Sequence, residues 1–277
     1  MRFDDAEFLA RAYGTDEGLS VRIETHRRYS VNAHDVFEEI TTEALKHLRP
    51  ERVLDVGAGN GNWYRALRRV LGTKTAYVGL DQSDGMVRRL QEETASDPSA
   101  EALIGNAQAL PWTLPTFDWV GMHFMLYHVP DIRLAIAEAW RVLVPGGLLL
   151  AATVTRKPYR ELLDLQAQGL RALGYEAAGM TNPSERFSLE DGAQFFPAAP
   201  KVLIYPSGFR FDAVDPALQY LASGPVDAAI THAKAPGTIR GELLRFVGER
   251  IAEQIEKTGS FIASSESGFF LLQKPVG

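Results

Sequence analysis

The 277-residue sequence contains no cysteine, which excludes disulfide bonds, thiolate metal sites and cysteine nucleophiles together. It also lacks any apolar run near the roughly 20 residues that a membrane-spanning helix needs. The first residues, MRFDDAEFLARAYG, are acidic, whereas a secretion signal begins basic and then turns apolar. We therefore expect a cytoplasmic protein with no membrane partner, and we predict no metal site.

Basic charge is also scarce. The chain has 29 Lys and Arg against 35 Asp and Glu, a net charge of −6. Proteins that bind phosphate backbones or anionic membranes usually carry a basic surface, so nucleic acid is disfavoured as a partner. Hydrophobic residues at 45% and charged residues at 23% are ordinary for a globular protein. A chain of this length can bury a substantial core and should fold by itself.

From residue 36 to 155, helical and strand patterns alternate with short connections, as in a mostly parallel sheet covered on both faces. The expected strands are ERVLDVG, AYVGLD, 102–105, 117–123 and 148–155. The expected helices are 36–48, 61–70, one capped by Ser83, and 131–143 with Asp131 as its N-cap. Beyond residue 155 we expect helices at 158–173 and 240–257 and strands at 201–205 and 261–273, which would complete the sheet.

A glycine-rich turn follows the first of these strands. Gly57, Gly59 and Gly61 let the backbone bend sharply and approach a ligand closely. A dinucleotide-binding turn would carry its third glycine at position 62, where this chain has Asn62. Asp55, two residues before the first glycine, would repel a pyrophosphate, but it suits the ammonium group of S-adenosylmethionine, directly or through water. Charge thus favours that cofactor over a nicotinamide dinucleotide.

A second acidic residue closes the next strand, AYVGLD. Asp81 stands 22 residues beyond Gly59, at a strand end where its oxygens can accept hydrogen bonds from ribose hydroxyls. Gln82 is placed to assist. Both dinucleotide enzymes and methyltransferases use an acid here, so Asp81 supports nucleoside binding without choosing between them.

Four segments, in order and correctly spaced, resemble motifs of the class I (Rossmann-like), S-adenosylmethionine-dependent methyltransferases of the bacterial small-molecule type. They are VLDVGAGNGNW, AYVGLD, GNAQALPW and FDWVGMHFMLYHVPD, the last with RVLVPGGLLL after it. The resemblance is close over residues 45–155 and looser at FSLEDGAQFF and SGFFLLQKP. It implies transfer of a methyl group from S-adenosylmethionine to a small molecule.

The resemblance also implies further residues of the cofactor site. Ala58 would line the turn together with its flanking glycines. Met86 would pack its thioether on the adenine ring, with a core methionine as the alternative. Asn106 replaces the acid usual in the family, yet its amide oxygen can accept from the adenine amino group, and the Ala107 amide can donate to the ring.

The N-terminal segment YGTDEGLSVRIETHRRYS resembles a leader that commonly forms part of a lid over the cofactor in such enzymes. Its candidate residues are Tyr13, Arg28 and Tyr29; the alternative is a surface helix with solvated arginines. We therefore predict an α/β fold with a doubly wound, mostly parallel seven-stranded sheet, a helical N-terminal lid and a cap insertion. The segments are a lid (1–35), the cofactor-binding core (36–155), the cap (156–200) and the completion of the sheet (201–277).

Two histidines, His123 and His128, follow the strand at 117–123 and are the candidate catalytic residues. Methyl transfer is a direct displacement at an activated carbon, so alignment and exclusion of water matter most and a base is optional. A hydroxyl or protonated amine must lose a proton, which a histidine can accept near neutral pH. Alternatively, His128 holds its loop and His123 lines the methionine end of the cofactor. Apolar residues that could form an acceptor pocket are Trp112, Phe124, Phe195 and Phe196.

Three competing functions remain. Asp55 and Asn62 argue against a nicotinamide-dependent oxidoreductase. A nucleic-acid methyltransferase would flip a base into its pocket, but HFMLYH differs from the Asn-Pro-Pro-Tyr of exocyclic-amine enzymes, and no cysteine is available to attack a pyrimidine ring. A non-catalytic protein that binds S-adenosylmethionine stays open. The acceptor, the atom that is methylated and the oligomeric state are not readable from the sequence.

Overall fold

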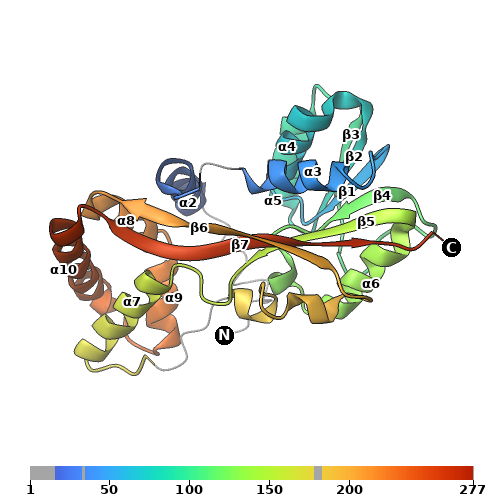
Figure 1. The fold of residues 1–277 in the computed structure, drawn as a ribbon. Coiled ribbons are helices and arrows are strands. Elements are labelled where there is room, and N and C mark those ends of the chain that lie inside the picture. Colours follow the sequence, from blue (N-terminus) through green and yellow to red (C-terminus); the bar gives the residue numbers. More distant parts are fainter. Residues whose placement is uncertain (1–15, 33–34, 178–182, 277) are drawn as a thin grey trace. The chain divides into compact units, whose positions relative to one another are not determined.

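The computed structural model describes residues 16–32, 35–177 and 183–276, and the chain forms two compact units (Figure 1). Of the described residues, unit 1 contains 16–32, 155–177, 183–185 and 206–266, and unit 2 contains 35–154, 186–205 and 267–276. Two long strands, β6 (Lys201–Phe211) and β7 (Phe261–Gln273), supply residues to both units.

The strands form one seven-stranded sheet in the order β3-β2-β1-β4-β5-β7-β6. The other strands are β1 (Arg52–Val56), β2 (Ala76–Asp81), β3 (Ala100–Ile104), β4 (Phe117–Gly121) and β5 (Leu143–Val154). β1 to β5 pair in parallel, and β7 runs antiparallel to β5. The predicted α/β fold with a mostly parallel seven-stranded sheet is confirmed. Because the chain runs outward from β1 to β3 and then returns to β4, the strand order reverses between β1 and β4, where α/β sheets bind ligands at the carboxyl ends of their strands.

Four helices of unit 2 cover the sheet. They are α3 (Val36–Leu45), α4 (Asn62–Leu71), α5 (Asp84–Thr94) and α6 (Ile132–Val142). The Ser83 hydroxyl accepts from Met86 N at 3.4 Å, and the Asp131 carboxylate accepts from Leu134 N at 3.0 Å, so both predicted N-caps are confirmed. Short 3-10 turns are η1 (Gly72–Lys74), η2 (Leu126–His128), η3 (Pro183–Arg186) and η4 (Gly192–Phe195).

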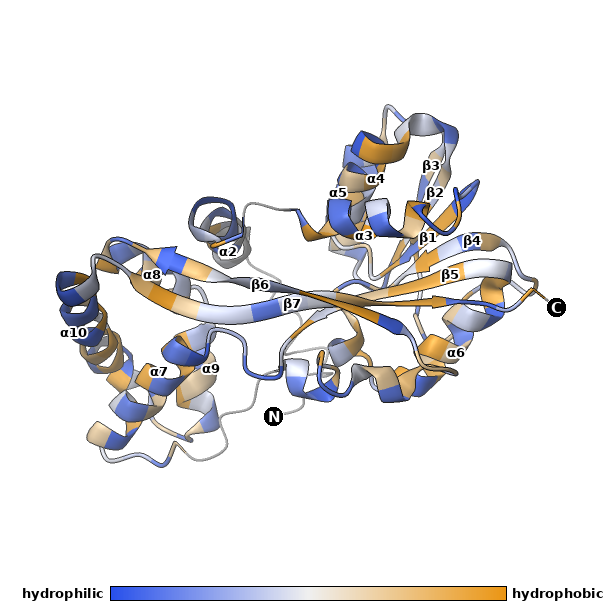
Figure 2. Ribbon diagram, in the orientation of Figure 1, coloured by the Kyte–Doolittle hydropathy of each residue, from blue (hydrophilic) through white to orange (hydrophobic). Residues whose placement is uncertain are grey.

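The core of unit 2 has a layer on each face of the sheet. On one face α6 packs against β1 and β4; on the other, α3, α4 and α5 do so. β5 contributes to both layers, Leu149 and Ala151 to the first and Leu148, Leu150 and Ala152 to the second. Figure 2 shows the hydrophobic middle of β5 accordingly. This confirms the prediction of a central strand buried on both sides.

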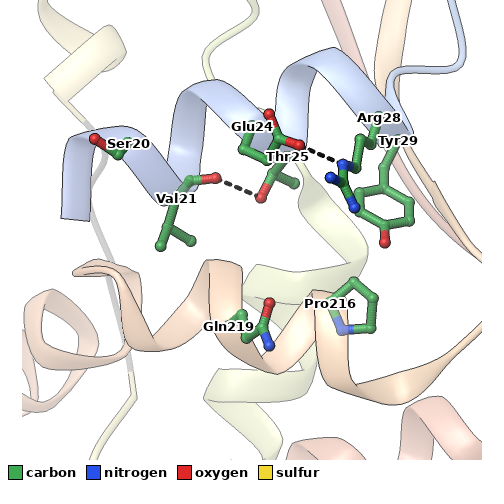
Figure 3. Close-up of a pocket in the computed structure, with 8 residues that line it drawn as sticks. All are labelled: Ser20, Val21, Glu24, Thr25, Arg28, Tyr29, Pro216 and Gln219. Atoms are coloured by element: carbon green, nitrogen blue, oxygen red, sulfur yellow. Dashed lines mark hydrogen bonds and ion pairs between the residues drawn. The ribbon is translucent and has the colours of Figure 1, made fainter. Parts of the chain in front are cut away.

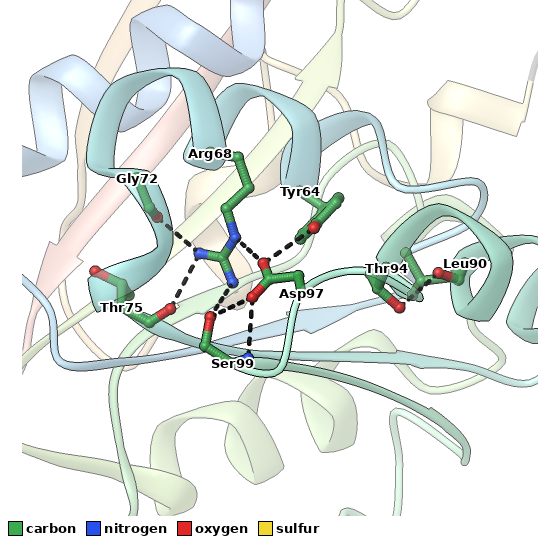
Figure 4. Close-up of polar contacts among 8 residues, drawn as sticks. All are labelled: Tyr64, Arg68, Gly72, Thr75, Leu90, Thr94, Asp97 and Ser99. Carbon is green, nitrogen blue, oxygen red and sulfur yellow. Dashed lines mark hydrogen bonds and ion pairs between the residues drawn. The ribbon is translucent and has the colours of Figure 1, made fainter.

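A polar cluster fixes α4 at the amino-terminal ends of β2 and β3 (Figure 4). Asp97 accepts hydrogen bonds from the Tyr64 hydroxyl at 3.0 Å and from the Arg68 guanidinium, and from Ser99 N at 2.9 Å. Arg68 also donates to the Thr75 carbonyl at 3.0 Å. The Arg68 and Asp97 side chains are only 12% and 5% exposed, so this ion pair is largely withdrawn from water.

Unit 1 is mostly helical. Its helices are α2 (Asp16–Tyr29), α7 (Arg160–Ala172), α8 (Val214–Ala222), α9 (Pro225–His232) and α10 (Arg240–Thr258), with a 3-10 turn η5 (Gly237–Ile239) before the last. α10 carries both hydrophobic and hydrophilic colours in Figure 2 and buries Leu243, Val247 and Ile251. These side chains share one hydrophobic cluster with Phe209 and Phe211 of β6.

The structure groups the chain differently from the four predicted segments. α7, from the predicted cap, packs its Leu162 and Leu170 into the same cluster as α8, α9 and α10, from the predicted completion of the sheet. The helices at 158–173 and 240–257 and both late strands were expected, whereas α8 and α9 were not. No helix among the described residues is long and apolar enough to cross a bilayer.

Candidate functional site

The glycine turn after β1 has the backbone geometry that its sequence demands. Gly57, Gly59 and Gly61 have φ of 72°, 54° and 82°, a region that side chains with a Cβ rarely adopt. A Cβ on Gly57 would lie 2.7 Å from Cγ of Met125, whereas one on Gly59 would meet nothing within 4 Å. The turn is therefore closely packed at Gly57 and open at Gly59, where a ligand could approach the backbone.

Asp81 ties this turn to the end of β2. Its Oδ2 accepts from Gly59 N and its Oδ1 from Ser83 N, both at 2.9 Å. Gly57 N and Ala58 N donate to the Leu80 carbonyl at 2.7 and 3.1 Å, which strengthens the same connection. Burial raises the pKa of Asp81. Each carboxylate oxygen has a further lone pair, so two hydrogen bonds to the backbone leave Asp81 able to accept from a ligand.

Two other predicted residues lie just beyond Asp81. Gln82 is exposed, and Met86 is half-buried in the first turn of α5. Asn106 is exposed, and its side-chain oxygen accepts from Gln108 N at 2.9 Å, forming a local turn that also carries the buried Ala107. Gly105 N donates to the Asp81 carbonyl at 2.9 Å. The turn after β3 is thus attached to the end of β2.

Asp55 is 2% exposed, near the end of β1. The Tyr77 hydroxyl, on β2, donates to Asp55 Oδ2 at 2.8 Å. Burial raises the pKa of Asp55 to about 7, although the Tyr77 hydrogen bond acts in the opposite direction. Near neutral pH this carboxyl group is therefore present both with and without its proton.

His123 follows β4 and is 6% exposed. Its ring lies edge-on to Trp63 and Phe37, with centroids 4.3 and 5.9 Å apart. Neither ring nitrogen has a hydrogen-bond partner among the residues that the structure describes. Burial lowers the pKa of His123 to about 3, so the ring is neutral at physiological pH. A base of so low a pKa accepts protons poorly near pH 7.

The loop after His123 carries the second candidate base. Phe124 has a left-handed backbone (φ 55°), a conformation that often marks functional segments. His128 is half-buried in η2. Its backbone N–H donates to the Met125 carbonyl at 2.9 Å, and the centroid of its ring lies 4.6 Å from that of the Tyr127 ring. Arg186 donates to the carbonyls of Tyr127, Val129 and Pro130, so a distant side chain holds this loop.

The predicted cofactor residues thus lie at the carboxyl ends of β1, β2, β3 and β4, and backbone hydrogen bonds join the first three ends. The predicted aromatic acceptor pocket is wrong as a single site. Trp112, Phe195 and Phe196 pack in the layer that contains α6, whereas Phe124 packs in the opposite layer, its ring 5.7 Å from Phe37. The sheet lies between them because the two layers cover its opposite faces.

The sequence analysis did not single out three residues of this region: Tyr77, Met125 and Arg186. A buried tyrosine inside an otherwise apolar strand was a usable signal, since its hydroxyl needs a partner. The register of β1 and β2, which sets that partner, is visible only in the fold. Arg186 gave no local signal because its partners are 56 to 59 residues away.

Of the predicted lid residues, Tyr13 lies outside the described residues. Arg28 and Tyr29 belong to α2 in unit 1, where they help to line a cavity of about 300 Å³ (Figure 3). Arg28 pairs with Glu24, and the Tyr29 ring lies 5.2 Å from Phe211. Pro216 and Gln219 of α8 complete the opposite wall of the cavity. All of its lining residues belong to unit 1.

Comparison with known proteins points to one family. Residues 53–147 match the family described as "Methyltransferase domain". A demethylmenaquinone methyltransferase from Staphylococcus aureus is 33% identical over 121 residues, which cover 44% of this chain and 50% of that protein. The chain therefore spans about half the length of the curated relatives it matches.

Two solved structures share the fold over 99% of this chain. One is the [4+2]-cyclase SpnF, with a TM-score of 0.56 and 17% identity, covering 96% of that chain. The other is phosphoethanolamine N-methyltransferase 2 from Haemonchus contortus, in complex with phosphomonomethylethanolamine and S-adenosylhomocysteine, with a TM-score of 0.56 and 16% identity over 60% of that chain. At such identities the likeness concerns the fold alone.

Proposed function

We propose that this chain, as a class I, S-adenosylmethionine-dependent methyltransferase, transfers a methyl group from S-adenosylmethionine to a small-molecule acceptor by direct in-line displacement. The observation that carries the proposal is the joined set of strand ends: an open glycine turn with Asp55 before it and Asp81 beside it. The hydrogen-bond donors and acceptors at these strand ends suit a nucleoside attached to an amino acid better than they suit a dinucleotide with its pyrophosphate.

The residues present fit this cofactor. Gly59 offers open backbone. Asp81 would accept from the ribose hydroxyls, with Gln82 beside it, and Asp55 would face the ammonium group. Met86, Asn106 and Ala107 would surround the adenine, and Gly57 and Ala58 would line the turn. His123 also fits, because its buried nitrogens have no partner among the described residues and a polar ligand group near them would satisfy one.

S-adenosylmethionine, when bound, supplies a methyl group on a positively charged sulfur. The protein's own task is to hold the acceptor in line and to exclude water. His123, neutral and enclosed by aromatic rings, suits the lining of the methionine end better than proton transfer. His128, half-buried on a loop held by Arg186, is the better candidate for receiving a proton from an acceptor hydroxyl or amine.

Two alternatives differ in their observables. A nucleic-acid methyltransferase would require affinity for a polyanion, against which the net charge of −6 argues. A non-catalytic protein would bind the cofactor without turnover. Because one relative is named a demethylmenaquinone methyltransferase, demethylmenaquinone is the first acceptor to assay, although that match covers half of the relative.

The proposal is tested by calorimetric titration with S-adenosylhomocysteine and S-adenosylmethionine. We expect both to bind, and Asp81→Ala to weaken both by about ten-fold or more, since a ligand hydrogen bond to a carboxylate contributes about 1.5–3 kcal/mol. Asp212→Ala, an exposed acid of unit 1, is the control and should leave both affinities unchanged. Absence of binding heat, or tight binding of NAD instead, contradicts the proposal.

The same preparation separates the possible roles of His128. In a methyl-transfer assay, His128→Ala should lower turnover while leaving the affinity for S-adenosylhomocysteine within about two-fold, if the ring accepts a proton. Equal losses of turnover and affinity would assign His128 to holding its loop. No turnover with any acceptor, with cofactor binding intact, would favour the non-catalytic alternative.

A further inference from the structure

We propose that Tyr77 is a positioning residue of the cofactor site: its hydroxyl holds the Asp55 carboxyl group where the ammonium group of the cofactor would meet it. The inference rests on the proposed function. It assigns a role to a residue that lies inside the AYVGLD segment but to which the sequence analysis gave no role.

Three neighbouring strands place Asp55 between two glycines. Gly79 of β2 and Gly121 of β4 are its register partners on either side. Register partners in parallel strands point their side chains to the same face of the sheet. Because both partners lack a side chain, the carboxyl group has room beside it in both directions along the sheet.

Two polar side chains extend into that room from opposite sides. A Cβ on Gly79 would lie 2.9 Å from the Tyr77 hydroxyl oxygen, and a Cβ on Gly121 would lie 2.6 Å from Nε2 of His123. Leu90 and Trp63 fill the rest of the two spaces. Tyr77 and Asp55 are 1% and 2% exposed, so their 2.8 Å hydrogen bond is screened from water.

The charged and titratable groups around Asp55 come from three elements. They are Tyr77 and Asp81 of β2, His123 just after β4, and Tyr64 and Arg68 of α4, which act on Tyr77. Burial raises the pKa of Asp55 most, the Tyr77 hydrogen bond lowers it, and the negative charge of Asp81 raises it. Arg68 is itself paired with Asp97. Tyr77 is therefore the group in contact with Asp55 that favours its ionised form.

The sign of the pH dependence follows from these neighbours. In the free protein the pKa of Asp55 is about 7. An ammonium group beside it favours the carboxylate, so binding releases to solvent the proton that Asp55 holds. The affinity for the cofactor is therefore highest above pH 7 and decreases as the pH falls through 7. Removing the Tyr77 hydroxyl raises the pKa of Asp55 further and moves this loss to higher pH.

The test is the pH profile of S-adenosylhomocysteine affinity, from pH 5.5 to 9, for the full chain, Tyr77→Phe and Tyr64→Phe. Tyr64 is a matched control: it is also buried, its ring lies 5.0 Å from that of Tyr77, and its hydroxyl donates to Asp97 at the other ends of the strands (Figure 4). The unmodified protein should lose about ten-fold in affinity from pH 8 to pH 6. Tyr77→Phe should bind about ten-fold more weakly at pH 7, with the difference closing near pH 9, and Tyr64→Phe should follow the unmodified protein.

The outcomes distinguish a failure of this inference from a failure of the proposed function on which it rests. If Tyr77→Phe reproduces the original profile, or Tyr64→Phe shifts it equally, the inference is wrong and the proposed function stands. If the unmodified protein does not bind S-adenosylhomocysteine at any pH, the proposed function itself fails. Should Tyr77→Phe not fold, titrations at pH 7 in two buffers of different ionisation enthalpy count the protons released. About half a proton from the unmodified protein and none from Asp55→Asn supports the inference; no release from the unmodified protein overturns it.

Discussion

At the scale of single residues, the site combines two titratable groups that burial drives toward neutrality in opposite directions. The pKa of Asp55 rises to about 7, and that of His123 falls to about 3, because an interior of low polarity disfavours either charge. His123 is held by aromatic rings, with no polar partner among the described residues. Its neutral ring therefore links folding to pH in a way that stability measurements can detect.

We predict that the protein loses more stability on acidification than His123→Phe does. The unfolded histidine binds a proton below its ordinary pKa of about 6.5, whereas the buried ring does not until about pH 3. The stability linked to the neutral His123 ring is thus fully present above pH 6.5 and is lost progressively as the pH falls toward 3. Between pH 7 and pH 5 the loss attributable to His123 should be about 2 kcal/mol. Urea unfolding at both values checks this: His123→Phe should lack that loss, and an equal loss in both proteins contradicts it.

Some residues of the proposed site were easier to predict from the sequence than others. The positions of Asp55 and Asp81 near strand ends were predictable because they depend on spacing from a strand and a glycine turn, which the linear sequence preserves. Their hydrogen-bond partners depend on register and on long-range contacts. Tyr77 meets Asp55 only because β1 and β2 pair with Arg52 beside Ala76, and Arg186 reaches a loop far away in the chain.

At the scale of elements, hydrophobic periodicity and caps located the helices and strands of the parallel region to within a few residues, except that β5 begins at Leu143 and not at residue 148. α8 and α9 escaped because they are only 9 and 8 residues long and contain Pro216 and Pro225, which suggest loops. Both prolines lie in a first helical turn, where a missing N–H breaks no helical hydrogen bond. Such short helices depend on packing in unit 1 more than on their own sequence.

A second prediction concerns the attachment of α4. Asp97→Ala should lower the free energy of unfolding by about 3 kcal/mol or more, because it leaves the buried guanidinium of Arg68 and the Tyr64 hydroxyl without their carboxylate (Figure 4). Glu253→Ala on α10 is the matched control: it breaks a 2.7 Å pair with Arg250, but those side chains are 50% and 45% exposed, so the cost should stay below about 1 kcal/mol.

The position of this ion pair makes the prediction specific. Thr75 and Ser99, which also bond to the pair, precede β2 and β3, so the cluster lies at the strand ends opposite the proposed cofactor site. Asp97→Ala should therefore keep its affinity for S-adenosylhomocysteine within about two-fold at a temperature where it is folded. A stability loss no larger than that of Glu253→Ala would show that the hydroxyl of Ser99 and the carbonyls around Arg68 suffice without the carboxylate.

At the scale of the whole molecule, the predicted cofactor residues and the matched family segment, 53–147, all fall in unit 2. Unit 1 has its own hydrophobic cluster and its own cavity. This division explains why the cofactor was predictable and the acceptor was not. Cofactor motifs are local and recur across a family, whereas acceptor recognition varies between its members and has no common spacing to detect.

Net charge is a property of the whole molecule, and it yields the last prediction. With a charge of −6, the protein should repel a polyanion and release no bound counterions from it. We expect labelled single-stranded and double-stranded oligonucleotides to show no change in anisotropy with this protein at low salt, under conditions where S-adenosylhomocysteine binds. With radiolabelled S-adenosylmethionine, label should accumulate in the low-molecular-weight fraction of a cell extract and stay absent from RNA and DNA. Salt-sensitive oligonucleotide binding together with labelled nucleic acid would instead establish the nucleic-acid alternative, and would locate the required positive charge in a local patch that the net charge conceals.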